Sequence, residues 1–297
     1  MKKKTFLLFA VPFTILAVLF VACSSNDEEM LVEKTSDYSK MQIAGELHNK
    51  TMSAVYSQIK SNSNIIPTGN HEVMLDSFAK VAKYYFDYEC DKNIKSTMHT
   101  KYKYFLDSEA FYTKVVAHRN ITRSKNNAEL TIESLNKTID SEYIDLDKLA
   151  SIDEMLYALN AKNIISNKAT AIMENIHNII CRSSEGTISD AEFQRQINNA
   201  WLELNAANLG DDSFEGLCIA STLYITQASF KWWKENQSAM PQKGKVAHWV
   251  ALDGAGALVG GLFHCFRHWD DQLVWGDLAL DCAEGAVCAS LGCVKFK

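Results

Sequence analysis

Two histidines near the C-terminus, four residues apart, have the spacing at which helical side chains can share a metal ion. His264 and His268 would lie on one helix face, and the next predicted helix carries carboxylates at Asp277, Asp281 and Glu284. Imidazole and carboxylate groups are common ligands of zinc and iron. An acidic stripe opposite an apolar one is also typical of the solvated face of an amphipathic helix, which is the interpretation we favour. We therefore expect no metal and no cofactor, and keep the two histidines as the candidate ligands.

A second pair of residues could form a histidine–aspartate unit between the two ends of the chain. His48 lies on the first predicted helix, and Asp253 lies in a segment of otherwise apolar or small residues. A buried carboxylate needs a partner, because burial of an unpaired charge is costly. We predict that His48 and Asp253 form a buried polar pair that joins the first helix to the last two. A catalytic role would also need a nucleophile or a metal, and the sequence identifies neither.

No catalytic motif of any specificity accompanies these residues. The sequence has no G-x-S-x-G, no H-E-x-x-H, no glycine-rich phosphate loop and no dinucleotide fingerprint. None of its eight cysteines has the C-x-x-C spacing of a zinc ribbon or a thioredoxin-type site. We expect most of the thiols to be buried as small hydrophobes. One disulfide is expected among the four cysteines nearest the C-terminus, Cys265, Cys282, Cys288 and Cys293.

The first 23 residues have the layout of a secretory signal that ends at a cysteine. Lysines at positions 2–4 precede an apolar run from Phe6 to Phe20, which is short for a membrane span. The four residues Phe20-Val21-Ala22-Cys23 resemble the lipobox of bacterial lipoproteins, although Phe20 stands where leucine is usual. The resemblance implies cleavage before Cys23 and attachment of lipid to it, and several acyl chains of the palmitate type give stable membrane anchoring. An uncleaved N-terminal anchor is the alternative.

Acidic residues follow this cysteine directly. The polar tether from Ser24 includes Asp27, Glu28 and Glu29, which resemble the surface-export signal of Bacteroides-type lipoproteins. Acidic tethers also serve as spacers that hold a domain away from an anionic surface. We expect a protein anchored by lipid to the bacterial outer membrane, with exposure at the cell surface as the finer expectation.

Two short segments, one at each end of the mature chain, resemble a single group of proteins. Uncharacterised lipoproteins of Bacteroides-type bacteria often pair a G-x-x-H-N motif on the first helix with a D-x-x-G-A-like helix near the end. The first motif is complete at Gly45-Glu46-Leu47-His48-Asn49. The second departs from the pattern, since Asp253-Gly254-Ala255-Gly256-Ala257 places glycine one and three residues after the aspartate. The resemblance implies a place in the cell envelope and no particular activity.

The charge of the chain limits its partners. Without the three lysines of the signal it carries 27 basic and 36 acidic residues, a net charge of −9. An acidic chain without a basic stripe argues against nucleic-acid binding. The expected partner is the membrane, through the N-terminal lipid, and the sequence does not identify a protein or glycan partner.

Helices are the elements that would position these residues. No glycine or proline occurs between His71 and Glu185, and strands joined by tight turns would need them. Ser151 with Glu154, and Ser189 with Glu192, have the spacing of capping boxes. We predict an all-α protein, an irregular multi-helix bundle after a lipoprotein signal peptide. Helices are expected near 38–60, 71–96, 104–118, 127–140, 146–161, 163–182, 190–208, 212–236, 246–268 and 271–293.

The predicted organisation has four parts. They are a signal peptide at 1–22, a lipidated acidic tether at 23–37, a helical domain at 38–240 and a small-residue helical pair at 241–297 packed on the same domain. In the last part, the small residues Gly256, Ala257, Gly260 and Gly261 form a predicted packing face that lets a second helix approach closely.

This glycine-rich pair leaves three interpretations open. It could be packed in a soluble core, which we favour, or form a membrane-inserting hairpin of 246–266 and 273–294, or carry a polar site. Insertion would place Asp277, Asp281 and Glu284 in lipid at high cost. We expect a lipid-anchored, non-catalytic binding or structural module. A membrane-active protein and an exported metal-dependent hydrolase are the alternatives.

Overall fold

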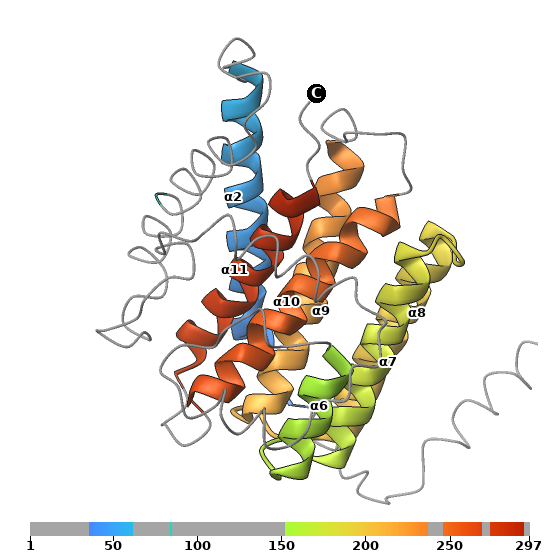
Figure 1. The fold of residues 1–297 in the computed structure, drawn as a ribbon, viewed down its shortest axis with the longest axis vertical. Coiled ribbons are helices and arrows are strands. Elements are labelled where there is room, and N and C mark those ends of the chain that lie inside the picture. Colours follow the sequence, from blue (N-terminus) through green and yellow to red (C-terminus); the bar gives the residue numbers. More distant parts are fainter. Residues whose placement is uncertain (1–35, 62–83, 85–151, 237–245, 269–273, 294–297) are drawn as a thin grey trace, which may run out of the picture. The chain divides into compact units, whose positions relative to one another are not determined.

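The computed structural model describes residues 36–61, 84, 152–236, 246–268 and 274–293, all of which belong to one compact unit, Ser36–Lys297. All regular secondary structure in these ranges is helical, which confirms the predicted all-α fold (Figure 1). The elements are η1 (Ser39–Met41), α2 (Gln42–Ser61), α6 (Ile152–Ala161), α7 (Asn167–Ser184), α8 (Asp190–Ala207), α9 (Phe214–Glu235), α10 (Val246–His268) and α11 (Trp275–Cys293). The helices predicted at 104–118 and 127–140 lie outside the described residues, as does the helix predicted at 71–96 except for Tyr84.

Serine side chains cap the starts of three of these helices. Ser166, Ser189 and Ser213 each have extended backbone and accept a hydrogen bond from the N–H three residues later, at the start of α7, α8 and α9. Such caps satisfy N–H groups that the first helical turn leaves without partners. The helix predicted at 163–182 therefore begins at Asn167, directly after its cap.

The capping box predicted at the start of α8 is formed only in part. Ser189 caps the helix, as predicted, but Glu192 turns to Arg195 and Gln196 instead of reaching back to the Ser189 N–H. Hydrogen bonds from Arg195 and Gln196 lower the pKa of Glu192 to about 2. The other predicted box begins at Ser151, outside the described residues.

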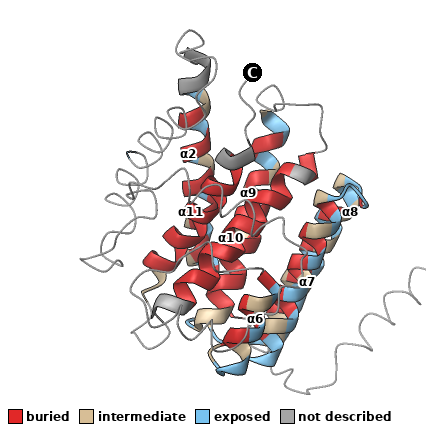
Figure 2. Cartoon of the chain, in the orientation of Figure 1, coloured by how far each residue is buried: buried red, intermediate tan, exposed pale blue. Residues whose placement is uncertain are grey.

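A hairpin of α10 and α11 forms the centre of the described helices. These two helices pack along each other, and α10 also packs on α9 and α7 while α11 packs on α2 and α9. Figure 2 shows both hairpin helices buried along most of their length. Within the described part of the chain, no helix combines the length and the apolar character that a membrane span requires.

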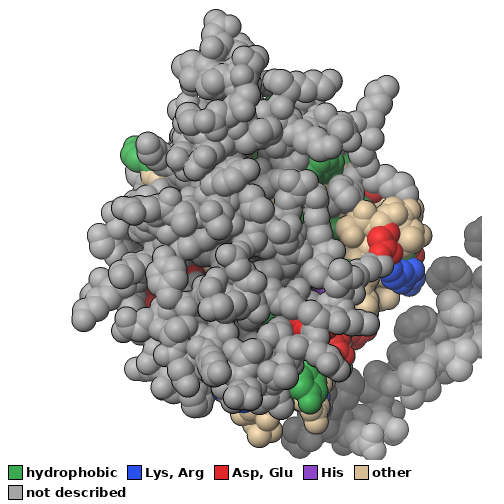
Figure 3. All heavy atoms as spheres, in the orientation of Figure 1, with side chains coloured by type: hydrophobic (Ala, Val, Ile, Leu, Met, Phe, Trp, Pro, Cys, Tyr) green, Lys and Arg blue, Asp and Glu red, His purple; other side chains and the backbone are tan. Residues whose placement is uncertain are grey.

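The helices α7 and α8 pack against each other with one face each toward solvent, as Figure 2 shows. In α8 the buried face consists of Phe193, Ile197, Ala200 and Leu204, which recur at helical spacing. On the surface seen in Figure 3, described acidic and basic side chains adjoin each other.

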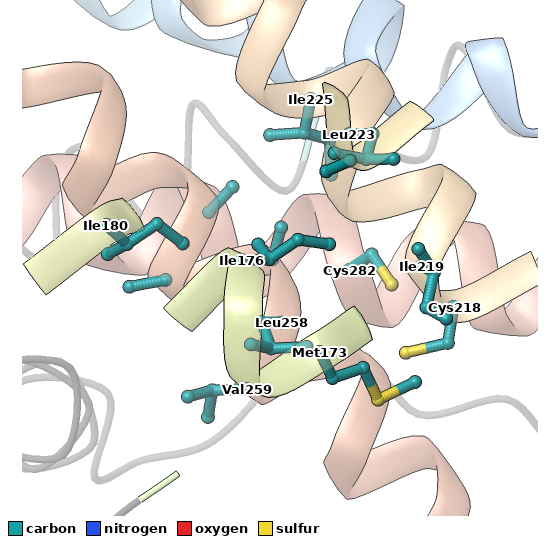
Figure 4. Packing of buried hydrophobic residues seen from close by; sticks show 14 of the residues in the cluster. Met173, Ile176, Ile180, Cys218, Ile219, Leu223, Ile225, Leu258, Val259 and Cys282 are labelled. Carbon is teal, nitrogen blue, oxygen red and sulfur yellow. The ribbon is translucent and has the colours of Figure 1, made fainter. Parts of the chain in front are cut away.

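Close packing of branched and sulfur-containing side chains joins α7 and α9 to the hairpin. Figure 4 shows the residues that fill this space: Met173, Ile176 and Ile180 of α7, Cys218, Ile219, Leu223 and Ile225 of α9, Leu258 and Val259 of α10, and Cys282 of α11. Each is at most 1% exposed, so burial of this apolar surface is the main favourable contribution to folding here.

Glycines allow α10 and α11 to pack backbone against backbone. A β-carbon at Gly260 would overlap the carbonyl oxygen of Asp281 in α11. β-Carbons at Gly256 and Gly285 would each overlap the carbonyl oxygen of the other glycine. Backbone atoms cannot rotate away as a flexible side chain can, so these positions exclude any larger residue.

The remaining residues of the predicted packing face are also buried, but they do not all face the same helix. A β-carbon at Gly261 would overlap the thiol of Cys218 in α9, and Ala257 is completely buried. The small residues of α10 thus admit two neighbours, α11 on one side and α9 on another.

Candidate functional site: histidine–aspartate pairs between helices

The structure places His48 of α2 next to Asp253 of α10. The His48 Nε2 atom lies 3.6 Å from Asp253 Oδ2, and both side chains are completely buried. The two residues are far apart in the sequence, and they meet because α2 packs along α9 and α11 beside the hairpin.

The Asp253 carboxylate is a hub that contacts three helices besides its own. Its Oδ2 atom accepts hydrogen bonds from the Ser229 hydroxyl and from the indole N–H of Trp233, at 2.7 Å, both in α9. Its Oδ1 atom accepts a hydrogen bond from the Ser290 hydroxyl of α11. With His48 of α2, this single carboxylate therefore links α2, α9, α10 and α11.

Hydrogen bonds also fix the orientation of the His48 ring. Its Nε2 atom lies 3.4 Å from Ser290 Oγ, and its Nδ1 atom lies 3.0 Å from Asn49 Oδ1. The Asn49 amide donates in turn to the carbonyl of Ala228 in α9, at 2.8 Å. The G-x-x-H-N segment thus contributes two polar residues to the contact between α2 and the helices around it.

Burial has the largest influence on the Asp253 carboxyl and raises its pKa above the usual 3.8. The nearby His48 ring and the hydrogen bonds from Ser229, Ser290 and Trp233 act in the opposite direction without cancelling that effect. This group consequently favours its neutral form more than an exposed aspartate does.

The arrangement contains serine, histidine and aspartate but not the order that activates a serine. In a catalytic triad, the imidazole lies between the hydroxyl and the carboxylate and removes the hydroxyl proton. Here the Ser290 hydroxyl donates directly to Asp253, and Ser290 is 1% exposed. The hydrogen bonds of these side chains hold the helices together. A substrate could reach the side chains only if the helices separated.

A second histidine–aspartate pair lies inside the hairpin. His264 Nδ1 of α10 is 2.7 Å from Asp281 Oδ2 of α11, and both side chains are buried. The ring of Phe214 in α9 stacks on the His264 ring, with 5.7 Å between centroids and 7° between planes. His268, the other candidate metal ligand, has a side chain outside the described part.

The prediction that the acidic residues of α11 form a solvated face is wrong. Asp277, Asp281 and Glu284 are 0%, 5% and 1% exposed. Helices α2, α9 and α10 all pack on α11, and the three carboxyl groups lie on no solvent-exposed face. His264 supplies Asp281 with a partner that the periodicity of α11 alone could not reveal.

The pairing of His264 with Asp281 leads to a prediction about metal binding. Among the described residues, no group of three or more histidine, cysteine, aspartate or glutamate side chains could hold a metal ion. We expect the purified protein to contain no stoichiometric zinc or iron and to keep its melting temperature after chelation, because Asp281 holds His264 Nδ1. Elemental analysis checks this. Near-stoichiometric metal that is lost in His264→Ala would contradict it.

A third pair, which the sequence analysis missed, lies between α6 and α7 and includes a thiol. His177 Nδ1 is 2.7 Å from Asp153 Oδ1, and His177 Nε2 is 3.4 Å from Cys181 Sγ. The four-residue spacing of His177 and Cys181 on one helix was visible in the sequence. Asp153 was not a recognisable partner, because it lies on another helix.

The other described thiols are buried and form no disulfide. They are Cys218, Cys265, Cys282 and Cys288. The bridge predicted among the four C-terminal cysteines is therefore wrong, since three of the four are not in disulfides. Each fills a buried position between helices, as expected of a small hydrophobe.

The residues predicted to carry the lipid and the export signal, Cys23, Asp27, Glu28 and Glu29, lie outside the described residues. Comparison with known proteins finds no family model that matches the chain, and no significant match among curated proteins or solved structures.

Proposed function

We propose that the chain is a lipid-anchored protein of the bacterial outer membrane whose helical unit is a non-catalytic binding or structural module. The lipobox-like Cys23 and the acidic residues after it support the anchor and exposure at the cell surface. The compact unit begins at Ser36, so residues 24–35 separate it from the lipidated cysteine. Fully extended, this tether would span at most about 40 Å, which keeps the unit close to the membrane.

The observation that supports a non-catalytic role best is the complete burial of the Asp253 hub. His48 and Asp253 are the residues that the sequence marks as candidates for acid–base chemistry, and both are 0% exposed. Their polar atoms contact one another, Ser229, Trp233 and Ser290. In this position they fasten α2, the first helix after the tether, to the centre of the unit.

A membrane-active hairpin is the other function considered for α10 and α11. Four carboxyl groups in these helices would have to enter the lipid or lose their buried partners, at high cost: Asp253, Asp277, Asp281 and Glu284. We therefore favour the packed module, and the effect of Gly260 substitutions on membranes distinguishes the two.

The anchor is tested by Cys23→Ala. The wild type should incorporate labelled palmitate and sediment with membranes, because acyl chains on the cysteine supply the anchoring energy. The variant should remain unlabelled and either stay as an unprocessed precursor or leave the membrane fraction. Cys181→Ser is the matched control and should be labelled like the wild type.

Equal labelling of the wild type and Cys23→Ala would contradict the lipoprotein proposal. Surface exposure is a separate question that protease treatment of intact cells addresses. If the double variant Glu28→Ala, Glu29→Ala is cleaved as readily as the wild type, the acidic residues are a spacer and not an export signal.

A further inference from the structure

The thiol of Cys181 has the neighbours of an activated nucleophile. Its Sγ atom lies 3.4 Å from His177 Nε2, and Nδ1 of the same ring lies 2.7 Å from Asp153 Oδ1. This order of thiol, imidazole and carboxylate lets the ring take the thiol proton while the carboxylate orients the ring. The Asp253 hub lacks that order.

Exposure separates this thiol from the others. Cys181 is partly exposed, whereas Cys218, Cys265, Cys282 and Cys288 are buried. Burial raises the pKa of Cys265 and Cys282 well above the usual value, which keeps them as unreactive thiols. The described part of the chain thus presents one thiol to solvent.

The surroundings of His177 favour its protonated form. Burial of the ring opposes the positive charge, but contacts with Cys181 and Asp153 outweigh it and raise the pKa of His177 above 6.5. The titratable groups that raise it are Cys181 on α7 itself and Asp153 on α6. A protonated ring at this place can donate a hydrogen bond from Nε2 to the Cys181 sulfur, 3.4 Å away.

We propose that Cys181 is a thiol–disulfide exchange site that reacts with low-molecular-weight disulfides. The Cys181 thiolate attacks one sulfur of the disulfide, a new S–S bond forms between them, and the original S–S bond breaks. The departing thiolate takes the proton held by His177. The disulfide is the only co-reactant, and the product is a mixed disulfide on Cys181 plus one free thiol.

The position of Cys181 favours a disulfide over an acyl substrate. Attack on a carbonyl builds charge on an oxygen and needs preorganised donors. Cys181 lies in the last turns of α7, where backbone N–H groups donate along the helix, as Glu185 does to the Cys181 carbonyl. Attack on sulfur instead develops charge on the departing sulfur, so it needs no such donors.

The test measures the rate of mixed-disulfide formation with the aromatic disulfide DTNB on the full-length protein, with peptide mass spectrometry to locate the modified cysteine. We expect Cys181 to be modified readily at pH 6. His177→Gln should slow this reaction at least about tenfold at pH 6, yet change it less than about twofold at pH 9.5, where an exposed thiol ionises without help. A purely structural role of His177 would not produce this pH dependence.

Asp153→Asn is a second test variant that leaves the buried His177 ring in place. The Asp153 side chain is 70% exposed, so its replacement does not disturb the core. The substitution should slow the reaction at pH 6 several-fold, and the matched surface change Asp212→Asn should leave it unaltered. Modification that persists in Cys181→Ser, or rates at pH 6 that do not respond to His177→Gln and Asp153→Asn, would overturn the proposal. An equal decrease in rate at pH 6 and pH 9.5 would also overturn it, because such a decrease indicates only that DTNB reaches Cys181 less easily.

Discussion

Gly260→Leu is expected to lower the melting temperature by about 2–12 °C, because overpacking costs typically 1–3 kcal/mol and each kcal/mol shifts melting by about 2–4 °C in a unit of this size. A β-carbon alone at this position already overlaps the carbonyl oxygen of Asp281. Relief would require α11 to move as a whole, which would disturb its contacts with α2 and α9.

Gly260→Ala separates packing from helix propensity in the same experiment. Alanine favours a helix interior by about 1 kcal/mol relative to glycine, so it would stabilise an exposed site. At Gly260 we expect a net loss instead. Asn199→Ala, at an exposed position of α8, is the matched control and should leave the melting temperature unchanged or slightly raised.

The same variants distinguish the packed module from a membrane-active hairpin. Calorimetry or circular dichroism gives the melting temperature, and dye release from liposomes reports membrane activity. If Gly260→Leu leaves melting untouched and alters dye release, α10 and α11 are exposed to membranes and the packed-core account is wrong.

Asp253→Leu is expected to reduce the free energy of unfolding by about 3–5 kcal/mol, the range found when one member of a buried pair is removed. The substitution leaves Ser229, Trp233 and Ser290 as buried donors without their acceptor. Asp253→Asn keeps one acceptor oxygen and should cost about 1–3 kcal/mol. Chemical denaturation measures both variants.

A surface aspartate provides the control for this prediction. Asp212, whose side chain is 84% exposed, pairs with Lys40 at the surface, and Asp212→Asn should change stability by less than about 1 kcal/mol. Equal effects of Asp253→Leu and Asp212→Asn would contradict the importance of the hub.

The pH dependence of the Asp253 contribution has a definite sign. Its pKa is raised in the folded protein, so the folded state binds the proton more tightly than the unfolded state. The resulting stabilisation is complete below pH 3.8 and is lost as the pH rises through the folded pKa. The stability advantage of the wild type over Asp253→Asn should therefore narrow as the pH rises from 4 toward 7.

Helix positions could be predicted from the sequence because the signals are local. Ser189 starts α8, and apolar residues at helical spacing mark its buried face, so one segment of sequence contains both pieces of information. The start of α7 was predicted too early, since its cap at Ser166 depends on a turn in which Asn163 has a φ of 56°.

The partners of buried polar residues could be predicted only in part. An aspartate among small residues indicated that Asp253 needs a partner, and His48 was the reasonable candidate. The sequence did not indicate Ser229, Trp233 or Ser290, because their meeting depends on the rotation and register of α9 and α11. Single-helix patterns do not contain that information.

The same limit explains why two histidine–aspartate contacts were not predicted. Asp281 was assigned to a solvated face because its buried partner, His264, lies on the preceding helix. Asp153 was not connected to His177 because the two face each other across α6 and α7. In both cases the deciding contact joins two helices, and no spacing within one helix predicts it.

A double-mutant cycle between Asp253 and His48 tests the central claim, that a buried polar hub fastens the first helix to the C-terminal hairpin. The free energies of unfolding of the wild type, Asp253→Asn, His48→Gln and the double variant give the coupling energy. We expect a coupling of at least about 1 kcal/mol, as for residues within one buried network, while Asp253→Asn with the surface change Asp212→Asn should be additive. Additivity of the Asp253 and His48 changes within about 0.3–0.5 kcal/mol would contradict the claim.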